Sequence, residues 1–108
     1  MDYQFLQLEQ QNQVATVWIN RAELHNAFNT QVIEELHTCF QSLNNRDDVR
    51  VVILAGRGKS FSAGADLNWM KQAGQASQAD NEADALKLAK MLQSLATLKQ
   101  PTIARVHG

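Results

Sequence analysis

The chain contains five consecutive apolar residues, Val51-Val52-Ile53-Leu54-Ala55, three of which are β-branched. This run is too short and too β-branched to favour a helix. Consecutive rather than alternating apolar positions are typical of a parallel strand that is buried on both faces. Because parallel strands need crossover connections, which are usually helices, the run predicts an α/β fold.

Two β-favouring stretches precede this run. We expect strands near residues 4–10 and 14–19, joined as an antiparallel hairpin. A helix is expected to follow, because the side chain of Asn29 or Thr30 can accept a hydrogen bond from a first-turn N–H group. The apolar face of this helix has spacings of four, four and three residues, at Val32, Leu36, Phe40 and Leu43.

The second half of the chain predicts one more helix and one more strand. Residues 71–80, rich in Gly, Ala, Ser and Gln, indicate a flexible segment over a site. A helix is expected from about residue 81 to 98 and is stopped by Pro101, with a strand at 102–106. In α/β folds the ligand-facing loops follow the strands, so we expect residues 1–108 to be part of a domain that is truncated at its C-terminal end.

Composition argues against several classes of protein. A formal net charge of -1 gives no basic surplus for binding nucleic acid. The single cysteine, Cys39, excludes an intrachain disulfide and a cysteine-based zinc site, and its apolar neighbours predict a core position. The sequence shows no signal peptide and no apolar stretch near the ~20 residues that span a bilayer. We therefore expect a protein of the cytoplasm, or of an organelle matrix if the source is eukaryotic, with no membrane partner.

The run at residues 56–70 carries the chemistry. Small residues at Ala63, Gly64 and Ala65 allow a ligand to approach the backbone N–H groups closely. A helix that opens at Asp66 directs free N–H groups and the positive end of its dipole toward whatever lies beside Ala65. Such a site can stabilise negative charge that develops on an oxygen atom.

Other interpretations of this region are possible. A phosphate-binding P-loop requires a glycine where Ile53 stands, and the nucleophile elbow of serine hydrolases requires one where Ser60 stands. Spacing alone leaves open an ordinary strand-to-helix connection whose small residues serve packing. The three histidines share no metal-ligand spacing, so no metal site is predicted, and His37 is expected at the solvent-exposed side of its helix.

Three segments, in the right order, resemble motifs of the crotonase superfamily, also called the enoyl-CoA hydratase/isomerase family. Residues 19–29 resemble its first CoA-side motif, and residues 56–70 resemble its central oxyanion-hole motif, with Ala-Gly-Ala-Asp-Leu intact at 63–67. Residues 100–108 resemble the strand that leads to the second half of the active site. Ala22 departs from the proline that is common in the family. The resemblance implies a crotonase-like α/β fold of repeated ββα units, of which this is the N-terminal portion.

The resemblance also implies a function. It implies an enzyme that hydrates a 2,3-unsaturated acyl-CoA through a thioester enolate held in an oxyanion hole. An isomerase, a dehydratase, a CoA-thioester hydrolase or a non-catalytic acyl-CoA-binding fragment are the alternatives. The backbone N–H of Ala65 would be the catalytic group, and the predicted substrate-binding residues are Arg21, Glu23, Leu24, Ala63, Ala65, Asp66, Leu67 and Asn68.

Further expectations follow from the same resemblance. No cofactor is implied beyond the coenzyme A moiety of the substrate, and the parent protein is implied to be a homo-trimer or hexamer. The second N–H donor and the acid/base carboxylates belong to family segments beyond Gly108, so the 108 residues alone are expected to be inactive. Residues 65–71 resemble the methylglutaconyl-CoA hydratase branch of leucine breakdown.

Overall fold

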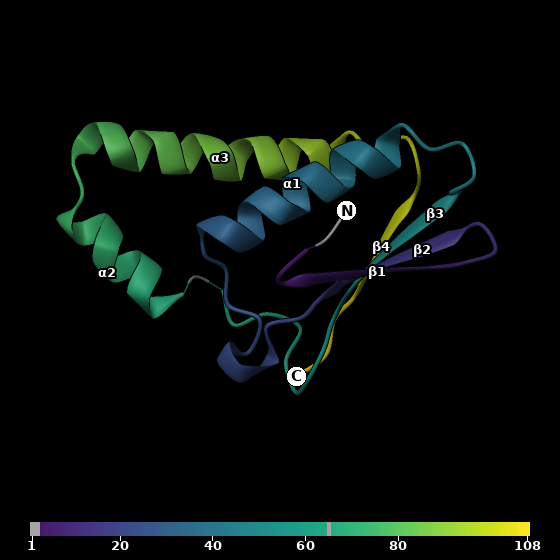
Figure 1. Ribbon diagram of the computed structural model, residues 1–108, viewed down its shortest axis with the longest axis horizontal. Helices are drawn as coiled ribbons and strands as arrows, with labels where there is room; N and C mark the ends of the chain where they lie inside the picture. Colours follow the sequence, from purple (N-terminus) through teal and green to yellow (C-terminus); the bar gives the residue numbers. More distant parts are fainter. Residues whose placement is uncertain (1–2, 65) are drawn as a thin grey trace.

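A computed structural model describes residues 3–64 and 66–108 of the chain. In this part of the chain, a four-stranded sheet with the order β1-β2-β3-β4 carries helices on one face (Figure 1). The strands and helices are β1 (Leu6–Gln11), β2 (Val14–Ile19), η1 (Ala22–Leu24), α1 (Thr30–Asn44), β3 (Val51–Gly56), α2 (Leu67–Gln75), α3 (Gln78–Ala96) and β4 (Thr102–Arg105).

The sheet combines one antiparallel pair with two parallel pairs. β1 and β2 form the expected hairpin, with Leu6 opposite Ile19 and Gln11 opposite Val14. β2, β3 and β4 are parallel, and the crossovers are α1 and then α2 with α3. The predicted α/β class is confirmed. β1, β2 and α1 make one ββα unit, and the remaining described elements run β3, α2, α3, β4.

Helix α1 supplies most of the core. The Asn29 side chain accepts a hydrogen bond from the Val32 amide at 2.9 Å. Of the two predicted candidates, Asn29 and Thr30, the N-cap is therefore Asn29. The predicted apolar face of α1 is fully buried against Ala15, Val17 and Ile19 of β2 and Val52 of β3. Cys39 lies in this core, as expected, and burial raises the pKa of its thiol to about 11.

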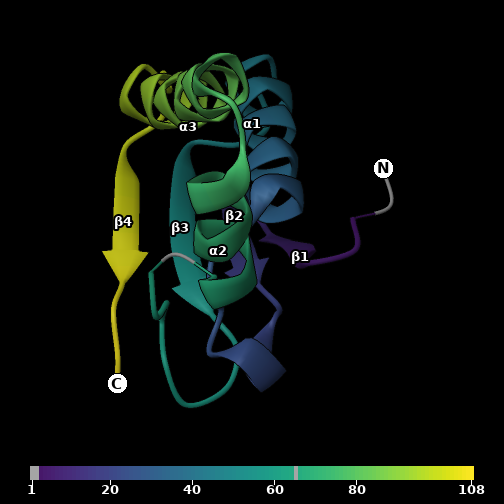
Figure 2. The ribbon, with the colours of Figure 1, turned by 90° about the vertical axis from the view of Figure 1, so that its left-hand side faces the viewer.

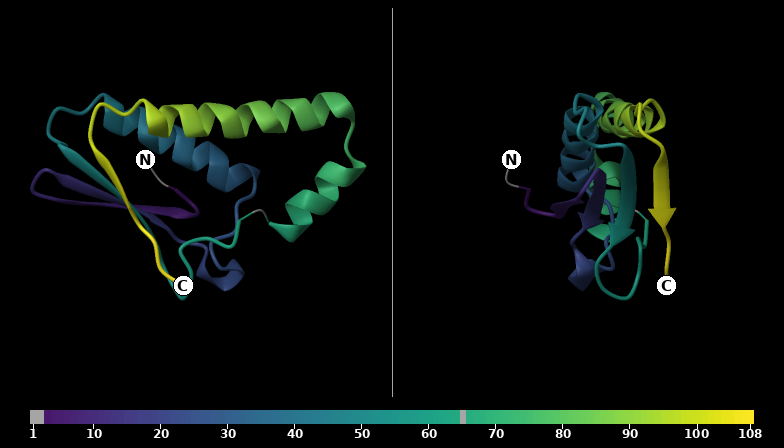
Figure 3. Two further views of the ribbon diagram at one scale, coloured as in Figure 1. Left: turned by 180° about the vertical axis from the view of Figure 1, so that it is seen from behind. Right: turned by 90° about the vertical axis from the view of Figure 1, so that its right-hand side faces the viewer.

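The prediction for β3 is only half correct. Val52 and Leu54, which face α1, are buried, whereas Val51 and Ile53 on the opposite face are half-buried. Ile53 is paired with Ile103 of β4, which is 55% exposed. The reason is that helices α1 and α3 both lie on the same side of the sheet (Figure 3), so the apolar run has a packed layer on that side.

The prediction of a flexible segment at residues 71–80 is wrong. α2 continues to Gln75, and α3 already begins at Gln78. The alanines and glutamines of this segment are good helix formers, and one glycine, Gly74, is tolerated within α2. The break between the helices is two residues long, and the side chain of Ser77 caps α3 by accepting from the Asp80 amide at 3.1 Å.

None of the described helices combines the length and the apolar character that crossing a membrane requires.

Candidate functional site

The carboxyl ends of the parallel strands gather two loops at one edge of the sheet (Figure 2). The loop at residues 20–29, which includes η1, follows β2, and the loop at residues 57–66 follows β3. The end of β4 reaches the second loop, because the His107 carbonyl accepts from the Phe61 amide at 3.0 Å. Three strand ends therefore meet here, where α/β folds place their ligands.

A cavity of about 560 Å³ lies between these loops and the start of α2. Its lining residues are Glu23, Leu24, His25, Ala27, Ala63, Asp66, Leu67 and Asn68. Six of the predicted substrate-binding residues are among them, namely Glu23, Leu24, Ala63, Asp66, Leu67 and Asn68. The fold brings these six residues together from segments about forty residues apart, and their role in binding stays a prediction.

The walls of the cavity suit an apolar ligand with a polar head. Leu24 and Leu67 are 45% and 79% exposed, so both walls present aliphatic surface. Glu23 and Asn68 add polar groups at the rim. A concave, mostly apolar site with a few convergent polar groups is the usual form of a small-molecule site.

The predicted catalytic residue, Ala65, lies outside the described residues. The residues on either side of it are held by Phe28: the Phe28 amide donates to the Gly64 carbonyl at 2.6 Å, and the Asp66 amide donates to the Phe28 carbonyl at 2.7 Å. Gly64 has φ +88° with open space where a Cβ would stand, so backbone conformation is what favours glycine there.

Asp66 caps the helix that begins at the cavity. Its Oδ1 accepts from the Trp69 amide at 2.9 Å, and its Oδ2 lies 2.8 Å from Nη1 of Arg21. The Trp69 N–H has the largest effect and holds the pKa of Asp66 below its ordinary value. Burial opposes this effect, and the Arg21 guanidinium lowers the pKa further. Asp66 is therefore ionised at neutral pH and oriented toward the protein.

Arg21 is placed differently from the other predicted residues. It is 8% exposed, and its Nη1 also donates to the Ala27 carbonyl at 2.9 Å. It borders a smaller cavity of about 220 Å³ that shares Asp66 and Asn68 with the larger one. Arg21 does not line the larger cavity but binds Asp66 and Ala27, which do.

Sequence reasoning missed three consecutive residues of the first loop. His25 and Ala27 line the cavity, and Asn26 between them is completely buried. His25 and Asn26 both have left-handed backbones, with φ of 52° and 58°. These residues lie within the motif at 19–29, and residue type was a further signal, because Asn and His are enriched among non-glycine residues with positive φ.

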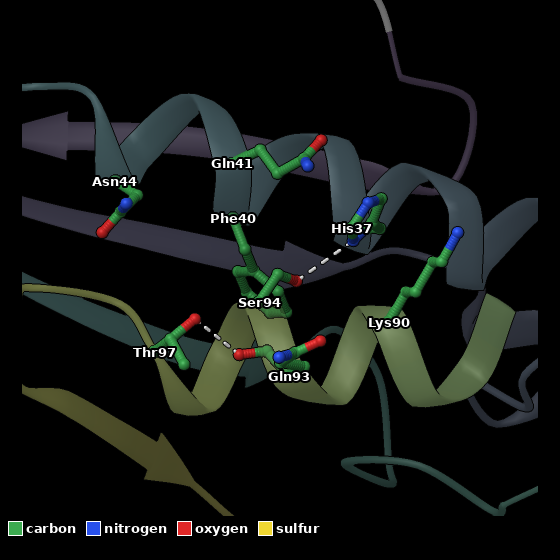
Figure 4. A pocket seen from close by; sticks show the side chains of 8 residues that line it. All are labelled: His37, Phe40, Gln41, Asn44, Lys90, Gln93, Ser94 and Thr97. Carbon is green, nitrogen blue, oxygen red and sulfur yellow. Dashed lines mark hydrogen bonds between the residues drawn. The ribbon is translucent and has the colours of Figure 1, made fainter. Parts of the chain in front are cut away.

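A second cavity, of about 490 Å³, lies between α1 and α3 (Figure 4). His37, which was expected at the solvent, is half-buried there, with its Nδ1 3.3 Å from Ser94 Oγ. Because the Ser94 hydroxyl donates to the Met91 carbonyl at 2.7 Å, its oxygen accepts from His37, and His37 is not in position to remove its proton. This pair is not a nucleophile and its base.

Within residues 3–64 and 66–108, no three His, Cys, Asp or Glu side chains come together as metal ligands would. The larger cavity presents the N-terminus of α2 and an apolar surface, together with the side chains of Glu23 and His25.

Comparison with known proteins identifies this arrangement. Residues 9–108 match the family model described as enoyl-CoA hydratase/isomerase. The chain belongs to this family. Its fold agrees with that of an enoyl-CoA hydratase from Shewanella pealeana, with a TM-score of 0.94 and 34% identity over 96% of this chain.

Two curated relatives show the range of the enoyl-CoA hydratase/isomerase family. The chain is 36% identical over 106 residues to the short-chain-enoyl-CoA hydratase of Clostridium acetobutylicum, covering 94% of this chain and 38% of the relative. It is 35% identical over 109 residues to the mitochondrial Delta(3,5)-Delta(2,4)-dienoyl-CoA isomerase of Mus musculus, covering 91% of this chain and 32% of the relative. The chain thus spans less than half the length of the relatives that it matches.

Proposed function

We propose that these residues are the N-terminal part of a crotonase-fold enzyme that hydrates a 2,3-unsaturated acyl-CoA. The observation that carries the proposal is the cavity at the carboxyl ends of β2 and β3, which collects six of the predicted substrate-binding residues. Its aliphatic walls, at Leu24 and Leu67, fit the pantetheine arm and acyl chain of a CoA thioester. Membership of the family supports the same ligand class.

The proposed chemical task of this part is to stabilise an enolate. Addition of water to the double bond places negative charge on the thioester oxygen, and an N–H donor aimed there stabilises that anion more than the neutral carbonyl. We assign one such donor to the backbone of Ala65. The N-terminus of α2, capped by Asp66, adds the positive end of a helix dipole beside it.

Proton transfer is assigned to groups beyond Gly108. Three of the glutamates described here are already engaged: Glu35 accepts from the Phe5 amide, Glu9 pairs with Arg57, and Glu34 pairs with Lys87. Glu23, at the cavity rim, is exposed and does not match the position of a family acid. The 108 residues alone are therefore proposed to be inactive.

The remaining parts of the proposal follow the resemblance. The enzyme needs no cofactor beyond the coenzyme A moiety, because backbone donors stabilise the oxyanion and carboxylates supply the acid–base chemistry. It assembles as a homo-trimer or hexamer in the cytoplasm, and 3-methylglutaconyl-CoA is the specific substrate that residues 65–71 suggest.

Isomerisation is the second candidate. The mouse dienoyl-CoA isomerase is as similar to this chain as the Clostridium hydratase, at 35% and 36% identity. Both reactions begin from a thioester whose oxygen gains negative charge, so the same N–H donor serves either. The carboxylates beyond Gly108 decide between them.

The products of one incubation distinguish these reactions. The full-length protein that carries these residues is given crotonyl-CoA, 3-methylglutaconyl-CoA or a dienoyl-CoA, and the products are analysed by mass spectrometry. Hydration adds one water to the acyl-CoA, isomerisation leaves its mass unchanged but changes its chromatographic retention, and hydrolysis releases free CoA thiol.

We expect the adduct of one water from at least one 2,3-enoyl-CoA. A product of equal mass with a changed chromatographic retention would show isomerisation instead of hydration. Free CoA thiol would show hydrolysis instead. If a folded protein binds the thioesters but returns all of them unchanged, it is an acyl-CoA-binding protein and not an enzyme for these substrates.

A further inference from the structure

Asn26 has the most complete set of hydrogen bonds among the described side chains near the cavity. Its Oδ1 accepts from the Arg21 amide at 2.8 Å. Its Nδ2 donates to the carbonyls of Arg57 and Ser60, both at 2.8 Å. The amide thus uses its acceptor on its own loop and both of its donors on the loop that follows β3.

The bond from the Arg21 amide is buried, and the two bonds donated to Arg57 and Ser60 are partly buried. Asn26 is 0% exposed, and a Cβ added at Gly56 would stand 2.8 Å from Asn26 Nδ2. A carbonyl that is shielded from water in part keeps a desolvation cost when it loses its donor. The carbonyls of Arg57 and Ser60 therefore depend on this one amide.

The two loops continue side by side beyond Asn26. The Asn26 carbonyl accepts from the Ser62 hydroxyl at 2.9 Å, and the His25 carbonyl accepts from the Ala63 amide at 2.9 Å. Farther on, Phe28 exchanges two backbone hydrogen bonds with Gly64 and Asp66. Asn26 lies at the start of this series, where the second loop leaves β3.

We propose that Asn26 is a positioning residue, which sets the distance between the two walls of the cavity by fixing residues 57–60 against residues 21–28. His25 and Ala27, its neighbours in the chain, line one wall, and Ala63 lines the other. Asn26 itself does not line the cavity, so it acts through the backbone of both loops. Its effect on catalysis rests on the proposed function, whereas its effect on loop geometry does not.

Asn26→Asp isolates the two donated bonds. Aspartate keeps the oxygen that accepts from Arg21 and tolerates positive φ, but its carboxylate faces two carbonyl oxygens with no hydrogen to donate. The matched control is Asn12→Asp, because Asn12 also has a left-handed backbone, with φ 56°, but lies exposed in the β1–β2 turn. Asn26→Gly removes the amide without adding charge and serves where Asn26→Asp does not fold.

Amide hydrogen exchange of the full-length protein without ligand tests the loop geometry. We expect the amides of Arg57 and Phe61 to exchange at least about tenfold faster in Asn26→Asp than in the wild type. Amides of Leu36 and Phe40 in α1 report global unfolding and are expected to change far less. Equal acceleration at both places, or none at Arg57 and Phe61, would overturn the positioning role.

Kinetics on an accepted enoyl-CoA test the consequence. If the loops shift, the N–H donor of the oxyanion hole no longer meets the transition state well, and kcat falls. Contacts that the enzyme makes equally to the substrate and to the transition state are kept, so KM stays nearly constant. We expect kcat to fall about tenfold or more with KM within about threefold, and Asn12→Asp to match the wild type. Local loop opening with an unchanged kcat would also overturn the proposal. A wild type without acyl-CoA activity would reject the proposed function and leave the exchange result to decide the role of Asn26.

Discussion

At the scale of single residues, the site depends on buried polar groups that satisfy one another. The side chains of Arg21 and Asp66 are 10% and 7% exposed and form an ion pair that joins the first loop to the N-terminus of α2. A buried pair contributes little relative to an apolar pair, but removal of one partner leaves an uncompensated charge. Removal of either Arg21 or Asp66 alone is therefore expected to destabilise the protein more than replacement of both by apolar residues.

Asp66→Asn is expected to destabilise the protein at neutral pH by about 1.5–3 kcal/mol, because asparagine can still cap α2 but does not neutralise Arg21. Urea denaturation measures the change. Asp47→Asn is the control, since Asp47 pairs with Lys99 on the surface with its side chain 99% exposed, and no measurable change is expected there. Equal effects of the two substitutions would contradict the importance of burial.

The same pair predicts a pH dependence. The pKa of Asp66 is lower in the folded protein than its ordinary value of about 4, so the folded state favours the ionised form. Its stabilisation is present above that ordinary value and is lost as the pH falls through the folded pKa. The difference in unfolding free energy between wild type and Asp66→Asn is expected to be constant near neutral pH and to shrink below about pH 4. A difference that grows on acidification would contradict this assignment.

The sequence predicted which residues line the candidate cavity more successfully than it predicted the contacts that those residues make. Leu24, Ala63 and Leu67 could be assigned because a motif marks them. The burial of Asn26 and the inward direction of Arg21 could not, because both depend on a loop that meets its partner more than thirty residues away along the chain. A local sequence pattern does not predict a contact between two loops that are so far apart in the chain.

At the scale of elements, periodicity predicted α1 and β-favouring residues predicted β2 and β4, whereas composition misled at residues 71–80. Ala, Gln and one Gly are compatible with a helix as well as with a loop, and the caps at Asp66 and Ser77 decide the matter. β3 was expected to be buried on both faces because its apolar run is continuous. Val51 and Ile53 on its second face are only half-buried because α1 and α3 both lie on the first.

The two helix caps predict different responses to substitution. Asn29→Ala removes the cap of α1, which packs on the core, so we expect a loss of about 1 kcal/mol in global stability by urea denaturation. Ser77→Ala removes the cap of α3, whose first turns are largely exposed, so we expect faster amide exchange in those turns with a smaller global change. A larger global loss from Ser77→Ala than from Asn29→Ala would show that α3 is anchored at its N-terminus.

At the scale of the whole molecule, one face of the sheet is packed and the other is open. Ile103 of β4 is 55% exposed and is paired with the half-buried Ile53. The chain spans less than half the length of its relatives in the enoyl-CoA hydratase/isomerase family. The fold positions the 560 Å³ cavity at the strand ends, and we propose that the proton-transfer groups come from the remainder of a longer protein.

We propose that the backbone N–H of residue 65 stabilises the thioester oxyanion. The most direct test of this proposal is kcat for enoyl-CoA hydration by the full-length protein, with Ala65→Pro, which lacks that N–H, compared with Ala65→Gly, which keeps it. We predict that kcat falls about 100- to 1,000-fold in Ala65→Pro and stays near the wild-type value in Ala65→Gly. A folded Ala65→Pro protein that hydrates its substrate as fast as Ala65→Gly would contradict the account.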